Sequence, residues 1–385
     1  MKIGITGPMT LKLLDFDFKN ESNVPKGYDH PMISMLINSM LKRGHKVVAY
    51  TTSIGINRSV VYNKGKSLTI CIAKRRERNA AKDLFRRERR NLVDLMLSYP
   101  VDIINAQWSY EFAWAAINSG MPTIVTLRDY AMKIFCYRSD AYRFIRLIMN
   151  YIVLNKSRYL STNSQYLFNQ LSKKQQKKAR IISNFYSKNL EKHHLDQEKK
   201  SNFILSVSNG FGRLKNISTA LEGFSIIRRK FKNIEYHLVG EDMELGGLAY
   251  KYAIKNKIEE GVKFFGKLSY EDVIEKMKKA LIFLHPSREE SFGMTVLEAM
   301  AVGTPVVGGH RSGNIPFLLD QGKTGLICDI NSPNDVAEKV MKVLSDCDFA
   351  KSISLKAKKS VRIKYSEEKT MQEYISYYKK VIKIW

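Results

Sequence analysis

LIFLHPSREESFGMTVLEAMAVGTPVVGG, residues 281–309, is the part of the sequence from which the architecture can be worked out. It opens with four apolar residues, too few for a helix, and then meets Pro286, so we expect a short buried strand followed by a loop. Apolar residues recur with helical spacing from Met294 to Ala301, Gly303 suits a left-handed cap, and Pro305 prevents continuation. Residues 305–307 then resemble a second strand. This strand, loop, helix and strand form one αβ unit of a parallel sheet.

The loop before that helix, residues 289–293, is placed where open α/β sheets bind ligands, at the carboxyl end of a strand. Gly293 allows close backbone approach, and the first amides of the helix suit a phosphate or diphosphate. Glu290 and Glu298 flank this anion site with acceptor-only carboxylates, which can take hydrogen bonds from sugar hydroxyls. A phosphate site beside a hydroxyl site predicts a nucleotide sugar as ligand. Glutamates also gather at helix starts for electrostatic reasons alone, and for Glu289 we prefer that explanation.

Glu290 and Glu298 are separated by seven residues, with Phe292-Gly293 between them and Gly303-Thr304-Pro305-Val306-Val307 after them. This pattern resembles the E-x7-E region of retaining glycosyltransferase family 4. The resemblance implies that Glu290 contacts the transferred sugar and Glu298 the ribose. It also implies donor contacts from five further residues: Ser291, Phe292, Gly293, Met294 and Thr295.

A second phosphate site is expected where the carboxyl-side half of the chain begins. Residues 203–207 read as a strand, and a glycine-containing loop then leads to Lys215 and a helix from about Ser218. Backbone amides and an ammonium group at such a place suit a diphosphate. Lys215 matches the lysine with which the resembling enzymes hold the donor phosphates. Their arginine falls on Asn209 or Gly210 here, and Arg213 is the alternative second cation from a shifted place.

The amino-terminal half shows the same alternation of strands and helices. Gly27 fits the glycine-containing loop of the resembling family, on the acceptor side. Two later strands, 101–108 and 122–127, carry Asn105 and end at Arg128 at positions where the resembling enzymes commonly have histidines. Arg128 cannot exchange a proton near neutral pH, so its catalytic role would be electrostatic, toward the leaving diphosphate or an acidic acceptor. A salt bridge with Asp129 or Glu111 is an equally good explanation.

Composition limits the class of protein. A chain of 385 residues with 44% hydrophobic residues suits two or three globular domains. The four cysteines are scattered, without metal-binding spacing, so neither a disulfide framework nor a zinc site is indicated and a reducing cytoplasm fits best. Neither a signal peptide nor a membrane-spanning segment is expected from the hydropathy of the sequence.

The formal net charge of +27 implies a polyanionic partner or surface. The densest basic run is KRRERNAAKDLFRRERR, residues 74–90. We weigh two explanations for it equally, namely apposition to an anionic membrane, worth about 1 kcal/mol per cation at a headgroup surface, and a solvated helix face. Nucleic acid is the weaker third, because no recognised binding module is visible.

The alternation of strands and helices predicts two doubly wound Rossmann-like α/β domains. The resemblance implies that they face across a cleft, as in the GT-B architecture. We expect residues 1–183 to form an acceptor-side domain, 184–202 a linker, 203–365 a nucleotide-sugar-binding domain, and 366–385 a helix that returns to the first domain. His193 and His194 are then expected to be exposed linker residues rather than ligands.

The resulting prediction is a metal-independent, retaining glycosyltransferase without a cofactor. It would move a hexosyl group from a UDP- or GDP-sugar to a glycan or lipid-linked acceptor, in surface polysaccharide or glycolipid synthesis at the inner face of a membrane. The alternative is a non-catalytic, basic, membrane-associated or partner-binding protein on a degenerate transferase scaffold. Three departures from the family's pattern support it: Asn105, Arg128, and Phe317, which stands where an acid is usual.

Overall fold

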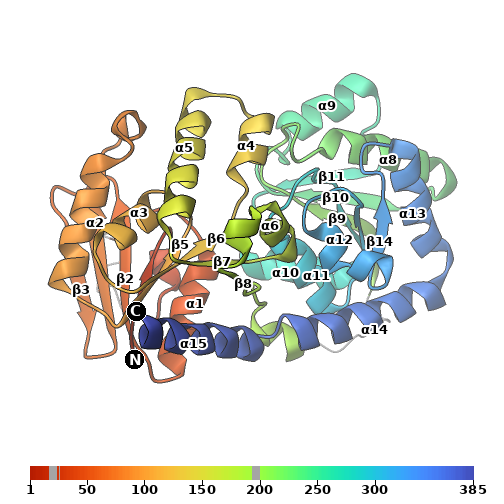
Figure 1. The fold of residues 1–385 in the computed structure, drawn as a ribbon. Coiled ribbons are helices and arrows are strands. Elements are labelled where there is room, and N and C mark those ends of the chain that lie inside the picture. The colour runs from red at the N-terminus through yellow and green to blue at the C-terminus, as the bar shows by residue number, and fades with distance from the viewer. Residues whose placement is uncertain (17–23, 26, 193–199) are drawn as a thin grey trace. The chain divides into compact units, whose positions relative to one another are not determined.

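The computed structural model describes residues 1–16, 24–25, 27–192 and 200–385. The chain divides into two compact units (Figure 1). Unit 1 comprises Met1–Ser183 together with Thr370–Trp385, and unit 2 comprises Asn184–Lys369. The predicted linker residues His193 and His194 lie outside the described residues.

Unit 1 is built on an eight-stranded sheet with the order β3-β4-β2-β1-β5-β6-β7-β8. Its strands pair in parallel, except that β3 runs antiparallel to β4 at one edge. The strands are β1 (Lys2–Thr6), β2 (Lys46–Ser53), β3 (Val60–Lys64), β4 (Leu68–Lys74), β5 (Ile103–Gln107), β6 (Thr123–Leu127), β7 (Tyr159–Thr162) and β8 (Ala179–Ile181).

Helices connect these strands and cover the sheet. They are η1 (Leu11–Leu13), α1 (Pro31–Lys42), η3 (Ala80–Asp83), α2 (Arg86–Ser98), α3 (Glu111–Asn118), α4 (Ala131–Tyr137), α5 (Ala141–Lys156), α6 (Gln165–Gln170), α7 (Lys173–Gln176) and, from the far end of the chain, α15 (Glu367–Ile384). Leu92 of α2 and Phe112 of α3 pack in one buried cluster with Ile104 of β5, so these helices cover the same face.

Unit 2 has a six-stranded parallel sheet with the order β11-β10-β9-β12-β13-β14. Its strands are β9 (Ser201–Val207), β10 (Glu235–Val239), β11 (Val262–Gly266), β12 (Ala280–His285), β13 (Val306–Gly309) and β14 (Leu326–Cys328). Its helices are η4 (Lys188–Lys192), α8 (Ile217–Lys230), α9 (Leu248–Asn256), α10 (Tyr270–Lys279), α11 (Met294–Val302), α12 (Ile315–Leu318), η6 (Asp320–Gly322), α13 (Pro333–Ser345) and α14 (Cys347–Lys364).

Both faces of the unit 2 sheet are buried, as successive residues of β9 demonstrate. Ile204 belongs to a cluster with Phe224 of α8, whereas Leu205 belongs to a cluster with Leu297 of α11. Because successive strand residues point to opposite faces, helices cover the sheet on both sides. The predicted fold class, two doubly wound Rossmann-like α/β domains, is confirmed.

Strand order reverses at one point in each sheet. In unit 2 the chain proceeds from β9 through β10 to β11 on one side and then returns to β12 on the other side of β9. In unit 1 the corresponding point lies between β1 and β5. Loops leaving the carboxyl ends of the two strands at such a point diverge and leave room for a ligand.

The basic run 74–90 is not a single solvated helix face. Its first residue ends β4, a turn follows, and α2 starts only at Arg86, after Leu84 and Phe85 in the left-handed conformation. Buried Glu88 accepts hydrogen bonds from the Arg76 guanidinium at 2.8 and 2.9 Å. Part of the positive charge is therefore neutralised inside unit 1, which the sequence did not reveal.

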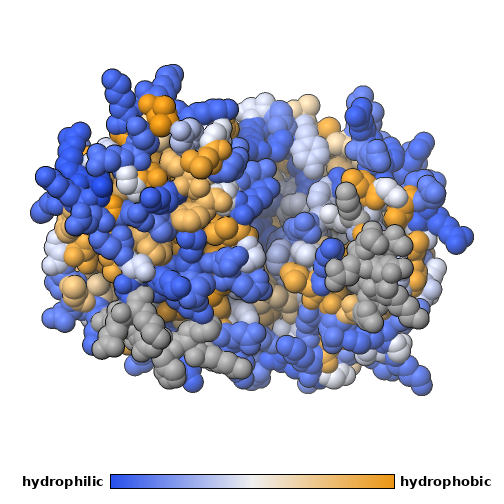
Figure 2. Space-filling view, turned by 180° about the vertical axis from the view of Figure 1, so that it is seen from behind, coloured by the Kyte–Doolittle hydropathy of each residue, from blue (hydrophilic) through white to orange (hydrophobic). Residues whose placement is uncertain are grey.

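Hydrophilic residues dominate the face of the molecule shown in Figure 2. Seen from behind, hydrophobic residues occur in separate groups among hydrophilic ones (Figure 2). Within the described residues, we find no helix that combines the length and the apolar composition needed to cross a membrane.

Candidate functional site

Two loops of unit 2 form the candidate site at the point where strand order reverses. One loop leaves β9 and enters α8, and the other leaves β12 and enters α11. The backbone amide of Arg288 donates to the carbonyl of Leu214 at 2.9 Å, so the two loops are directly joined. The predicted phosphate lysine, Lys215, and the predicted sugar-binding carboxylate, Glu290, are therefore brought into one place.

Lys215 and Glu290 form an ion pair across these loops, with Nζ 2.8 Å from Oε1. The Nε2 atom of His285, the last residue of β12, lies 3.5 Å from the same oxygen. Burial would raise the pKa of Glu290, but the Lys215 ammonium and His285 outweigh that effect and hold the pKa far below its usual range. Glu290 is therefore a carboxylate over the whole physiological pH range.

The start of α11 is shaped to approach a ligand closely. Gly293 precedes the helix with φ +96°, and no side chain caps this described helix start or places an acid in its first turn. The opening amides, which begin at Met294 and Thr295, are thus available to an anion. This geometry agrees with donor binding by residues 292–295, which stays a prediction.

Gly313 and Asn314 hold the Glu290 loop in place from the neighbouring strand connection. The Asn314 backbone amide donates to the Glu290 carbonyl at 2.8 Å, and its side-chain amide donates to the Phe292 carbonyl at 3.0 Å. A Cβ on Gly313 would stand 2.2 Å from the Glu290 carbonyl oxygen, so this close approach requires glycine. Neither residue was predicted from the sequence to be part of the site.

Asn216 holds the Lys215 loop in place through hydrogen bonds of its side chain. Its buried side-chain amide donates to the carbonyls of Pro286 (3.2 Å) and Ile330 (2.7 Å) and accepts from the Thr219 hydroxyl. Three loops therefore share one asparagine, which adopts the left-handed conformation with φ +55°. The sequence does hint at this role, because an Asn stands directly between Lys215 and a helix. Asn tolerates the left-handed conformation better than other non-glycine residues.

Glu298 lies in the second turn of α11 and is half-buried. Burial raises its pKa to about 7, although a hydrogen bond from Tyr270 at the start of α10 lowers it in part. The pKa values of the two carboxylates are thus shifted in opposite directions, since Lys215 and His285 lower that of Glu290 and burial raises that of Glu298. Tyr270 was not predicted, because α10 lies far from the motif in the sequence.

The remaining predicted donor residues lie on the same loops. Arg213 is exposed, and its carbonyl accepts a hydrogen bond from the Arg288 guanidinium at 2.7 Å. Asn209 is also exposed, and its side-chain oxygen accepts from the Glu241 amide at 3.5 Å. Ser291 is partly buried between Glu290 and Phe292. The identity of the second phosphate cation stays a prediction.

In unit 1, the Asn105 side chain forms hydrogen bonds with other buried residues of the protein. Its side-chain amide donates to the Tyr378 hydroxyl of α15 at 2.6 Å and accepts from the Thr126 hydroxyl at 2.7 Å, and all three residues are buried. Both ends of the amide therefore hold the sheet and α15 together. The acceptor-side role predicted for Asn105 stays a prediction.

Arg128 is 8% exposed and follows β6 directly. Its Nε donates to the side-chain oxygen of buried Gln107 at 2.7 Å, and burial lowers the pKa of its guanidinium. The carboxylates considered as its partners have other contacts: Asp129 accepts from Trp108 and Tyr110, and Glu111 pairs with Arg146. The catalytic role predicted for Arg128 is untested.

Gly27, the other predicted acceptor-side residue, is exposed. It lies near the carboxyl ends of β1 and β2, because a Cβ placed on it would be 3.6 Å from the carbonyl oxygens of Met9 and Thr52.

Among the residues that the structure describes, no group of three or more His, Cys, Asp and Glu side chains could hold a metal ion.

Comparison with known proteins gives the family of unit 2. Residues 187–360 match the family described as "Glycosyl transferases group 1". The N-acetyl-alpha-D-glucosaminyl L-malate synthase of Bacillus anthracis is 30% identical over 181 residues, which cover 47% of this chain and 46% of that protein. The chain thus spans less than half the length of this curated relative.

Two solved structures share the fold of the whole chain. Sucrose-phosphate synthase from Thermosynechococcus elongatus superimposes with a TM-score of 0.79 at 15% identity and full coverage of both chains. Anabaena HepE in complex with UDP and glucose superimposes with a TM-score of 0.70 at 14% identity, with 98% of each chain covered. At such low identity the likeness shows a shared fold only. The family match is independent of it, and residues 187–360 of this chain are a domain of the group 1 glycosyl transferases.

Proposed function

We propose that the chain is a metal-independent, retaining glycosyltransferase that moves a sugar from a nucleotide-sugar donor to a glycan or lipid-linked acceptor. The observation that carries this proposal is the Lys215–Glu290 ion pair beside the open start of α11, at the point where strand order reverses in unit 2. A cation, free helix amides and an acceptor-only carboxylate are the groups that a sugar diphosphate needs.

Each group has one task in this proposal. The donor diphosphate binds the amides at the start of α11 and the Lys215 ammonium, which has hydrogen-bond donors beyond the one that Glu290 occupies. Glu290, fixed as a carboxylate, accepts hydrogen bonds from the transferred sugar, and Glu298 accepts from the ribose. As the glycosidic bond breaks, negative charge grows on the diphosphate, and the same cation and amides stabilise it.

The comparisons support a nucleotide-sugar donor. The Anabaena HepE structures contain UDP, UDP with glucose, or UDP-glucose. The Bacillus anthracis relative is named for a product that joins an N-acetylglucosaminyl group to L-malate. We carry over to this chain only the class of donor, a UDP- or GDP-sugar, and propose surface polysaccharide or glycolipid synthesis as the setting.

Replacement of Glu290 tests the proposal. Glu290→Ala should abolish sugar transfer, a loss of about 100-fold or more in kcat/KM, because the carboxylate would contact the reacting sugar. UDP binding, measured by calorimetry, should fall far less. Glu338→Ala is the matched control, since Glu338 is an exposed glutamate on α13 that pairs with Lys339.

A panel of UDP- and GDP-sugars identifies the donor from hydrolysis and transfer. Full activity of Glu290→Ala would disprove the assignment. If the unaltered protein neither binds nor hydrolyses any member of the panel, the non-catalytic scaffold becomes the better explanation.

We also propose that the protein works at the cytoplasmic face of an anionic membrane. The net charge of +27 supports this, and so does α5, which exposes Phe144, Ile148 and Tyr151 at spacings of four and three residues. The protein should sediment with phosphatidylglycerol vesicles and not with phosphatidylcholine vesicles, and added salt should release it. Equal recovery with both lipids would contradict this location.

A further inference from the structure

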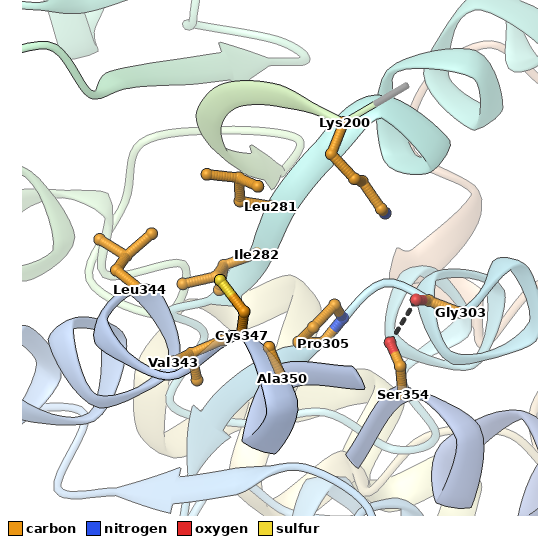
Figure 3. Close-up of a pocket in the computed structure, with 10 residues that line it drawn as sticks. All are labelled: Lys200, Leu281, Ile282, Gly303, Pro305, Val343, Leu344, Cys347, Ala350 and Ser354. Atoms are coloured by element: carbon orange, nitrogen blue, oxygen red, sulfur yellow. Dashed lines mark hydrogen bonds between the residues drawn. The ribbon is translucent and has the colours of Figure 1, made fainter. Parts of the chain in front are cut away.

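A cavity of about 200 Å³ lies in unit 2 away from the candidate donor site (Figure 3). Leu281 and Ile282, at the amino end of β12, form one side of it, and Gly303 and Pro305, between α11 and β13, form another. The Glu290 loop leaves the opposite, carboxyl end of β12. The cavity and the donor site therefore lie at opposite ends of the strands of the same sheet.

Apolar side chains form most of the cavity wall. They come from β12, the end of α13 and the start of α14: Leu281, Ile282, Val343, Leu344 and Ala350. An apolar cavity of roughly 150 Å³ in a protein core stays dry and binds benzene, so this one has room for a six-membered ring or a chain of similar size. Transfer of an apolar group from water into this space is favourable.

One cation stands at the edge of this apolar space. Lys200 donates from Nζ to the Ala280 carbonyl at 3.0 Å and to the Thr304 hydroxyl at 3.4 Å. An ammonium group has three donors, and contacts within the described part of the chain occupy two of them, which leaves one for a ligand. No Asp or Glu is among the ten described residues that line the cavity.

The pKa of Lys200 agrees with a site at which an anion would bind. Burial alone lowers the pKa of its amine to about 8, so the charged form predominates at pH 7 while its environment disfavours it. A carboxylate beside the ammonium would compensate that cost.

We propose that this cavity binds a small amphiphilic carboxylate, whose apolar body contacts the five apolar side chains and whose carboxylate pairs with Lys200. The geometry limits the ligand to one ring or a chain of about six carbons. A neutral molecule of the same shape binds more weakly, and a cationic one is repelled. This site is separate from the sugar-transfer function and does not depend on it.

Cys347 provides a direct measurement, because it lines the cavity and its sulfur points toward Ile282 in Figure 3. The chain has four cysteines, of which Cys71 and Cys328 are buried and Cys136 is exposed. In a Cys136→Ser background, Cys347 is thus the accessible thiol. Hexanoate should slow its alkylation by iodoacetamide about tenfold at roughly ten times the dissociation constant, hexan-1-ol should do so only at higher concentration, and hexylamine should have no effect.

Lys200→Met in the same background tests the ion pair. This variant should bind hexanoate and hexan-1-ol alike, because the apolar wall remains and the charge does not. Lys351→Met is the matched control, since Lys351 is exposed on α14 and is not among the residues that line the cavity. If hexanoate protects Cys347 no better than hexylamine does in the Lys200 protein, the proposal is wrong, whether or not the Lys200→Met variant folds.

Discussion

Two glutamates of one motif, eight positions apart, have opposite protonation behaviour in this protein. Lys215 and His285 keep Glu290 ionised, whereas burial beside Tyr270 raises the pKa of Glu298 to about 7. A carboxylate accepts hydrogen bonds from two ribose hydroxyls more strongly than a protonated carboxyl, which has given up part of its acceptor capacity. In the role proposed for it, Glu298 is therefore a better ribose acceptor above neutral pH.

This difference predicts how donor binding depends on pH. Affinity for UDP should rise about tenfold between pH 6 and pH 8 as Glu298 loses its proton, and level off above. Calorimetry with Glu298→Gln supplies the comparison, because the nucleotide's own titration is common to both proteins. Identical pH profiles for the two proteins would exclude Glu298 from nucleotide binding. The same raised pKa makes folding less favourable as pH rises from 4.5 to about 7, because the unfolded carboxyl releases its proton first.

At this scale the sequence predicted the residues that lie on the two loops and missed those that support them. Lys215 and Glu290 were predictable together because each follows a strand, and carboxyl ends of parallel strands share an edge. His285, the polar residue that closes the apolar strand β12, was not predicted as a neighbour of Glu290. Tyr270 acts through a contact with Glu298, a residue distant in sequence, for which a single sequence offers no local signal. For Asn216 the sequence offered only its position directly before a helix, because its partners Pro286 and Ile330 lie far along the chain.

At the scale of the element, α11 depends on two glycines that perform different tasks. Gly293 precedes the helix, and a Cβ on it would meet the Ile315 side chain at 2.7 Å. Gly313, with φ +60°, accommodates the backbone of the Glu290 loop itself. A side-chain neighbour can move, but a carbonyl oxygen in the loop moves only together with Glu290.

Gly313→Ala should therefore both destabilise unit 2 and displace Glu290. We expect a loss of about 3 kcal/mol or more in unfolding free energy, combining the left-handed backbone cost with the clash at 2.2 Å. Gly246→Ala is the control, since Gly246 has φ +78° and nothing within 4 Å of the added Cβ, so it should lose only about 1 kcal/mol. Denaturant unfolding measures both. Equal losses would show that the close approach to Glu290 is unimportant.

The elements themselves were largely predictable. The strands expected at 101–108, 122–127, 203–207 and 305–307 are present as β5, β6, β9 and β13, and α11 ends at the left-handed Gly303 as expected. The antiparallel strand β3 and the break in the basic run were not predictable, since both depend on pairing with residues elsewhere in unit 1. Arg89, which stacks on the Trp114 ring at 3.8 Å, illustrates how a surface-like residue joins the core through its neighbours.

At the scale of the whole molecule, unit 1 is assembled from two separate parts of the chain. Residues 370–385 contribute buried Met371, Tyr374, Tyr377, Tyr378 and Val381 to it. The Tyr377 hydroxyl donates to the Leu160 carbonyl at 3.0 Å, and the Tyr378 hydroxyl accepts from Asn105. The last helix is therefore a structural part of the first unit.

Tyr378→Phe should destabilise unit 1 by about 1–3 kcal/mol, because it leaves the buried Asn105 amide without its acceptor. Tyr151→Phe is the control, since Tyr151 is 70% exposed on α5, and it should change stability by less than about 0.5 kcal/mol. Calorimetry should show the change in one unfolding transition and not in the transition of unit 2. A shift of both transitions together would mean that the two units unfold as one.

Unit 1 consists of the first and the last part of the chain, and this determines the order in which the two units can be completed during synthesis at the ribosome. After Ser183 has been synthesised, 186 residues of unit 2 must follow before Thr370 is added. At about 5–20 residues per second this takes roughly 10–40 s. Throughout that interval the nascent first sheet lacks the helix that pairs with Asn105, while the second sheet can complete itself. The part of the protein that is translated first is thus the last to reach its finished state.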